Sequence, residues 1–197
     1  MFPERQIRAS YNNKTIRVYQ AYNKSIANAA LKKGTLMAPP FKMDRMTWIK
    51  PSFLWMMYRC GWGFKDKGQE YILGIDISIK GFNWALKHAC LSKFVPHLHE
   101  DYESWKKEKP DVRVQWDPER NLKLEKLEYR SLQMGLAGEA VQKYVNDWII
   151  SIEDVTGTAH QIYQKVKLND FEGARLLLPN EEPFPVSKDV KTRLLMS

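Results

Sequence analysis

The order of strand-like and helix-like segments constrains the fold of this chain more than any other feature. In the first half, strands rich in β-branched and aromatic residues alternate with helical segments. Several strands then follow one another, and two short helices come last. Because this order is not the regular repeat of a parallel sheet, it predicts an α+β fold. The expected strands are 15–22, 45–49, 71–79, 112–116, 122–127 and 148–152, and the expected helices are 25–33, 52–59, 81–94, 158–168 and 170–178.

One stretch, Tyr129–Thr156, combines a turn, a carboxylate and a strand. Gly135 and Gly138 predict the turn, Glu139 follows it, and the alternation along Trp148–Ile152 predicts the strand. A carboxylate on such a turn could stabilise charge in the cleft of an enzyme. The simpler alternative is a solvated glutamate that begins a short helix.

Size and charge limit the class of protein. A chain of 197 residues, 44% hydrophobic and 27% charged, fits one globular domain, expected at residues 1–186 with a loose tail at 187–197. The net charge of +8 favours polyanionic partners. The first residues resemble no signal peptide and no apolar run is long enough to span a bilayer. The expectation is therefore a protein without a membrane partner that is cytoplasmic, or delivered by a route that the sequence does not reveal.

Metal-binding patterns are absent from the sequence. Cys60 and Cys90 have no zinc-like spacing, and both are expected to be buried thiols. His97 and His99 have no third ligand nearby in sequence. No metal site is predicted. The sequence also lacks the GxGxxG, GxxxxGK[ST], HExxH and GxSxG motifs, which argues against Rossmann enzymes, P-loop NTPases, zincins and α/β-hydrolases.

Aromatic and polar side chains interrupt two segments that otherwise look like core strands. The first is Tyr19–Tyr22, which ends a strand, and the second is Arg45–Ser52, where a strand leads into a helix. Rings of this kind stack on bases, Arg and Lys bind phosphates, and a carboxylate such as Glu139 binds ribose hydroxyls. Together the residue types suit a nucleotide.

Each of these residues also has a plainer interpretation. Tyr19, Tyr22 and Trp48 could be ordinary core aromatics. Lys50 could be a surface lysine, and Ser52, next to a proline, is most simply the N-cap of a helix.

Longer strings carry a resemblance. RQIRASY, VYQAYN, RMTWIKPSFLWMMYR, VQWDPER and YRSLQMGLAGEAV, spread from about Arg5 to Pro185, resemble a family of domains of unknown function found in bacteria and fungi. That family is similar in turn to divergent ADP-ribosyltransferases, through the order of a first strand and helix, a strand running into a helix, and a glutamate before a late strand. The resemblance implies a split β-sheet core with an NAD cleft and C-terminal helices.

The same resemblance implies a function and a site. NAD is the expected substrate, and its ADP-ribose is transferred to a protein side chain or nucleic acid. Glu139 would stabilise the positive charge that develops on the ribose as the bond to nicotinamide breaks. A similar charge develops on the sugar during glycoside hydrolysis. Trp48 would stack on the nicotinamide or line its pocket. The full set of implied NAD-binding residues is Arg8, Tyr19, Gln20, Tyr22, Arg45, Trp48, Lys50 and Ser52.

Several points depart from the ADP-ribosyltransferase pattern. Gln20 stands where the two main branches have His or Arg, and Arg8 or Arg17 could take that place instead. Ala137, two residues before Glu139, leaves the acceptor open. Two rivals therefore stand beside the enzyme: a basic module that binds RNA or DNA without catalysis, and a protein-interaction domain in which Glu139 is structural.

Overall fold

Two small sheets meet edge to edge at the centre of the computed structural model, which describes residues 3–96, 101–107 and 110–196. The three-stranded sheet has the order β2 (Thr15–Tyr22), β4 (Tyr71–Ser78), β8 (Ile149–Asp154), all antiparallel. The four-stranded sheet has the order β3 (Thr47–Ile49), β7 (Lys126–Leu136), β6 (Val112–Arg120), β5 (Ala89–Leu91), with only β5 and β6 parallel. These sheets make the chain a single α+β domain, as the segment order predicted.

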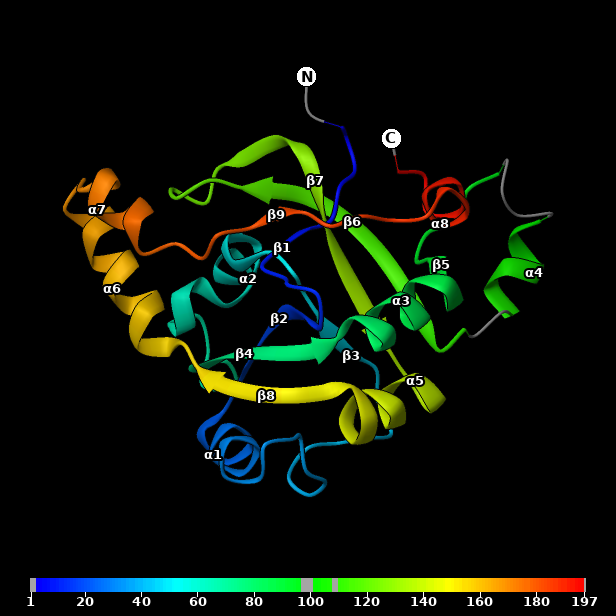
Figure 1. The fold of residues 1–197 in the computed structure, drawn as a ribbon, viewed down its shortest axis with the longest axis horizontal. Helices are drawn as coiled ribbons and strands as arrows, with labels where there is room; N and C mark the ends of the chain where they lie inside the picture. The colour runs from blue at the N-terminus through cyan, green and yellow to red at the C-terminus, as the bar shows by residue number, and fades with distance from the viewer. Residues whose placement is uncertain (1–2, 97–100, 108–109, 197) are drawn as a thin grey trace.

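A backbone hydrogen bond joins the two sheets. The amide of Tyr19 on β2 donates to the carbonyl oxygen of Lys50, directly after β3, at 2.7 Å. The chain ends pair separately, where β1 (Arg8–Ala9) lies antiparallel to β9 (Glu182–Pro183). In Figure 1 the segment with β9 crosses the molecule from α7 to α8 alongside β1.

Helices cover the sheets on several sides (Figure 1). Helix α1 (Lys24–Lys33) begins at the N-cap Asn23 and ends at Gly34, whose φ of 70° suits glycine. Helix α2 (Phe53–Cys60) leads into the 3₁₀ turn η1 (Gly61–Gly63). The others are α3 (Ile79–His88), α4 (Tyr102–Lys107), α5 (Gly138–Lys143) with the π-helical turn η2 (Tyr144–Trp148), α6 (Thr156–Lys167), α7 (Phe171–Leu176) and α8 (Lys188–Arg193).

Four expected elements differ from the structure. The strand predicted at 122–127 lies mostly in the turn before β7, which begins at Lys126 and runs to Leu136. The helix predicted at 81–94 ends at His88, and Ala89–Leu91 forms strand β5 instead. The turn predicted at Asp117–Pro118 is part of β6, which continues to Arg120. The glycine turn predicted around Gly135 is the end of strand β7, and only Gly138 has a positive φ, 48°. In each case pairing with a neighbouring strand determines the structure, against the helix, turn or strand that the local sequence pattern predicts.

The expected loose tail is also different. Residues 188–193 form α8, and Val190 and Leu194 are buried in the main core. The indole nitrogen of Trp116 donates to the carbonyl oxygen of Leu194 at 2.9 Å. The described part of this segment is therefore packed on the domain.

Of the two cysteines, Cys60 is buried as expected and Cys90 is half-buried. His97 and His99 lie outside the described residues, in which no group of three or more His, Cys, Asp or Glu side chains could hold a metal ion. Across the described ranges, no helix has both the length and the apolar composition needed to cross a bilayer.

Candidate functional site: a cationic cavity where the two sheets meet

A cavity of about 780 Å³ opens beside the contact between the two sheets. Its volume lies in the range of small-molecule and cofactor sites. The end of β2, the loop before β3, helix α2 and the strands β6 and β7 all contribute to its wall. The lining residues central to its chemistry are Gln20, Tyr22, Lys42, Arg45, Trp48, Lys50, Arg59, Gln115 and Gln133.

The cavity brings together five of the eight residues predicted to bind the nucleotide. Gln20 and Tyr22 come from β2, and Arg45, Trp48 and Lys50 come from the segment around β3. These two segments are distant in sequence, but the contact between Tyr19 and Lys50 places them side by side.

Gln20 links the elements around the cavity. It is 4% exposed, and its side-chain nitrogen donates to Thr47 Oγ1 at 2.7 Å and to the Trp48 carbonyl oxygen at 3.1 Å. Its oxygen accepts from the hydroxyl of Tyr144 at 2.8 Å. Because both ends of this amide are already hydrogen-bonded, Gln20 holds the wall of the cavity in place.

Lys50 is a buried amine in this wall. Lys50 is 6% exposed, and its Nζ donates to the Trp48 carbonyl oxygen at 2.9 Å. No described carboxylate lies within ion-pair range of Nζ. Burial, followed by the nearby Arg59 guanidinium, lowers the pKa of Lys50 to about 7, although Cys60 and Asp117 act in the opposite direction.

Trp48 packs against the end of β7. It is paired with Gly135, and a Cβ atom at Gly135 would lie 2.6 Å from Met46 Sδ and 3.0 Å from Trp48 Cζ2. Glycine at this position therefore gives the indole room against the sheet. The ring is half-buried and remains part of the cavity wall.

The cavity is strongly cationic. Lys42, Arg45 and Arg59 join Lys50 in its wall, and none of the described lining residues is an aspartate or glutamate. Such a site attracts anionic groups, and arginine binds phosphate through two parallel hydrogen bonds.

Sequence reasoning missed two glutamines in this site. Gln115 on β6 and Gln133 on β7 are cross-strand partners and both line the cavity. Each alternates with buried apolar residues such as Val114 and Met134, so a polar strand face could have been recognised. The register that places them opposite each other depends on long-range pairing.

Glu139 lies elsewhere. It is in the first turn of α5, its side chain is 64% exposed, and a carboxylate oxygen lies 3.2 Å from Nζ of Lys143. It does not line the cavity. This arrangement corresponds to the simpler alternative, a solvated glutamate that begins a short helix.

Ser52 and Tyr19 do not line the cavity either. Ser52 is the N-cap of α2, accepting from the amide of Trp55 at 3.2 Å and donating to Glu119 Oε1 at 2.9 Å. Tyr19 is 2% exposed and packs edge-on against Phe53. Both therefore follow the plainer interpretations, a helix cap and a core aromatic.

Arg8 binds the C-terminal segment rather than a ligand site, donating from Nη2 to the carbonyl oxygen of Glu181 at 2.8 Å. Two carboxyl groups, Glu119 and Glu181, lie near it. Burial raises the pKa of both carboxyl groups, while the Arg8 charge opposes the shift.

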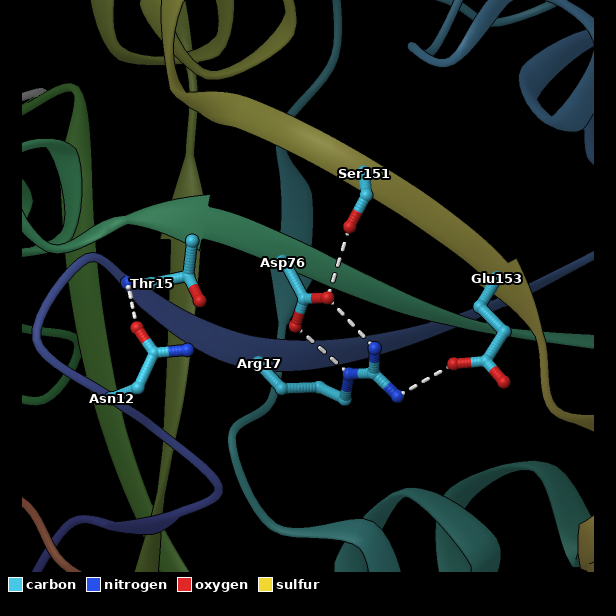
Figure 2. A network of polar contacts seen from close by, with 6 residues as sticks. All are labelled: Asn12, Thr15, Arg17, Asp76, Ser151 and Glu153. Atoms are coloured by element: carbon cyan, nitrogen blue, oxygen red, sulfur yellow. Dashed lines mark hydrogen bonds and ion pairs between the residues drawn. The ribbon is translucent and has the colours of Figure 1, made fainter.

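Arg17, the other candidate for the first motif, lies on one face of the three-stranded sheet (Figure 2). Its Nε and Nη2 donate to the two oxygens of Asp76 at 2.9 and 2.7 Å, and Nη1 donates to Glu153 at 2.8 Å. Ser151 completes the network by donating to Asp76 at 2.9 Å. Of Arg8, Arg17 and Gln20, only Gln20 lines the cavity.

Comparison with curated proteins finds no match. A family model does match, over residues 6–184, which include every element named above except α8. Because this match covers most of the chain, the protein belongs to the family described as Domain of unknown function (DUF4291).

Proposed function

We propose that this domain binds a nucleotide in the cavity between its sheets, and that the nucleotide is NAD. The observation that carries the proposal is the cationic wall: Lys42, Arg45, Lys50 and Arg59 surround one cavity, with no carboxylate among its described lining residues. Phosphates are the common anionic groups that such a site binds. Trp48 supplies an aromatic face beside these cations.

NAD fits the site by chemistry and by size. Its two phosphates suit the cations, its rings suit Trp48, and the cavity volume of about 780 Å³ is in the range of cofactor sites. The choice of NAD among nucleotides rests on the sequence resemblance to ADP-ribosyltransferases.

The charge of the cavity bears on whether ADP-ribose is transferred there. In that reaction the bond between ribose C1′ and the nicotinamide nitrogen breaks, nicotinamide leaves with the electron pair, and an acceptor nucleophile bonds to C1′. Positive charge develops on the ribose, so a carboxylate is needed close by. Binding of NAD is therefore better supported than transfer, which requires a carboxylate from outside the cavity wall.

Titration calorimetry of three proteins tests the proposal: the parent chain, Arg45→Ala and Arg175→Ala. Arg175 is an exposed arginine on α7 that does not line the cavity, so it serves as the matched control. We expect NAD to bind the parent and the control equally. Loss of one charged hydrogen bond should weaken binding to Arg45→Ala about 10- to 100-fold.

The same samples separate the rival functions. A short single-stranded RNA that binds more tightly than NAD, with an affinity that falls steeply as salt rises, would assign the cavity to nucleic acid. Equal NAD affinity for Arg45→Ala and the parent would contradict the proposed site.

Nicotinamide release measured on Glu139→Gln tests the carboxylate that the resemblance implies. A catalytic Glu139 would give a loss of about 100-fold or more. Because this side chain is exposed and paired with Lys143, we expect any turnover to stay at the parental rate. A large loss with unchanged NAD affinity would instead restore Glu139 as the catalytic group.

A further inference from the structure

We propose that Gln115 and Gln133 form a pair of hydrogen-bond acceptors, fixed in orientation by Asp117, that binds an NH₂ group of the nucleotide. The inference rests on the proposed function, since it concerns one end of the same cavity. It assigns the ligand class more narrowly, to nucleotides that carry an amino or carboxamide NH₂ group.

Strand pairing places the two amides together. Gln115 on β6 is the direct cross-strand partner of Gln133 on β7. Directly opposed residues of an antiparallel pair have Cβ atoms about 4.5–5.5 Å apart and point to the same face. Both side chains are half-buried and line the cavity.

Asp117 determines which atom of each amide faces the cavity. The nitrogen of Gln115 donates to Asp117 Oδ1 at 3.0 Å, and the nitrogen of Gln133 donates to Oδ2 at 2.5 Å. A carboxylate can only accept, so it holds both NH₂ groups toward itself. The two carbonyl oxygens are left as acceptors, and among the described residues no group donates to them.

The same cavity also contains a donor. Lys50 lines the same cavity, and Asp117 is close enough to act on its charge. A ligand group that offers NH₂ hydrogens to the two glutamines and an acceptor atom to Lys50 would satisfy all three. A carboxamide has this pattern, and so does the amino edge of adenine, where the ring nitrogen is the acceptor.

The inference is tested by measuring the affinity of the parent chain for NAD and for two analogues that each differ from NAD at one group. Nicotinamide hypoxanthine dinucleotide replaces the adenine NH₂ with oxygen, and nicotinic acid adenine dinucleotide replaces the carboxamide NH₂. In either case an oxygen would face two carbonyl oxygens. We expect one of these analogues to bind about tenfold more weakly than NAD, and which one does so identifies the bound end.

Variants show whether the glutamines cause the discrimination. Gln133→Met keeps the length of the side chain but removes the acceptor, so NAD and the weaker analogue should bind it with nearly equal affinity. Asp117→Asn, which can donate to the amides and release their orientation, should also reduce the discrimination. Gln161→Met is the matched control, because Gln161 is exposed on α6 and does not line the cavity.

Three results would overturn the inference. Equal affinity of the parent for NAD and both analogues would contradict it while leaving nucleotide binding intact. If Gln133→Met and Asp117→Asn both still bind NAD more tightly than the weaker analogue, other residues must cause the difference in affinity. Absence of NAD binding to the parent would overturn this inference together with the proposed function.

Discussion

Lys50 shows how one residue departs from the usual rules of burial. Lysine is rarely buried without an acidic partner, because removing an unpaired ammonium from water is costly. Here the cost is met in part by deprotonation, since the pKa of Lys50 falls to about 7. An anionic ligand would supply the missing counter-charge and favour the protonated form. A residue of this kind points to a binding site.

The effect of Lys50 on stability should depend on pH. Its pKa is about 7 in the folded chain, against an ordinary value of 10.5 for a solvated lysine, so the unfolded chain holds more protons between these values. The free energy of unfolding should therefore rise with pH across this window, by at most about 1.4 kcal/mol per pH unit from this group. Lys50→Met removes the titration, so its stability advantage over the parent should be largest below pH 7 and shrink as the pH rises.

Urea unfolding of both proteins between pH 6 and 10 provides the measurement, with the exposed Lys87→Met as the control. A difference between parent and Lys50→Met that does not change with pH would show that the amine is not desolvated.

At the scale of elements, the first turn of α2 is held by side chains from three separate segments. Ser52 accepts from the amide of Trp55, Glu119 accepts from Ser52, and Glu181 Oε1 accepts from the amide of Phe53 at 2.7 Å. Acceptors at this end satisfy amides that have no partner inside the helix. The contact from Glu181 also ties the C-terminal segment to the helix that carries Arg59.

Two substitutions of Glu181 should separate its hydrogen bond from its charge. Burial raises the pKa of this carboxyl group, so its stabilising effect is fully present below the unfolded pKa and is lost as the pH rises through the folded pKa. Glu181→Gln keeps an acceptor for Phe53 without the charge, and should be at least as stable as the parent at pH 7. Glu181→Ala should be less stable than the glutamine variant by about 1 kcal/mol.

Thermal unfolding at pH 4 and pH 7 checks this prediction. The advantage of Glu181→Gln over the parent should be larger at pH 7. If the alanine variant equalled the glutamine variant at both pH values, the contact with Phe53 would contribute nothing.

At the scale of the whole molecule, the sequence predicted what depends on neighbours in the chain. Strand Thr15–Tyr22 is observed with the predicted bounds, because its residues alternate clearly. The ends of α1 also depend on near neighbours, since Asn23 accepts from the amide of Ile26 and Gly34 has a positive φ of 70°. Strand β5 was missed because three residues at the end of a helix carry too little pattern.

Some residues of the candidate site could likewise be predicted from the sequence, and others could not. Residue type pointed to Arg45, Trp48 and Lys50, and the resemblance added Gln20; the cavity brings these four together. Gln115 and Gln133 become partners only through the register of two strands, which a sequence does not display. Glu139 was selected for a turn that is in fact the end of a strand and the start of a helix, and there the carboxylate meets solvent and Lys143.

The C-terminal segment should contribute to the stability of the whole domain. Leu194 is fully buried, although it lies outside the residues matched by the family model. Leu194→Ala should lower the free energy of unfolding by about 2–5 kcal/mol, as removal of a buried leucine side chain usually does. Lys191→Ala, an exposed change on the same helix, should stay within about 0.5 kcal/mol of the parent.

Deletion of residues 187–197 should cost more than Leu194→Ala, because the contacts of buried Val190 are also lost and Trp116 loses its acceptor, the Leu194 carbonyl oxygen. Urea unfolding monitored by tryptophan fluorescence gives all three values on one scale. Parental stability of both Leu194→Ala and the deletion would mean that α8 is not docked in solution and that the domain ends near Val186. The expected losses would instead make α8 part of the folding unit, with residues 187–196 needed to cover the core beside β6.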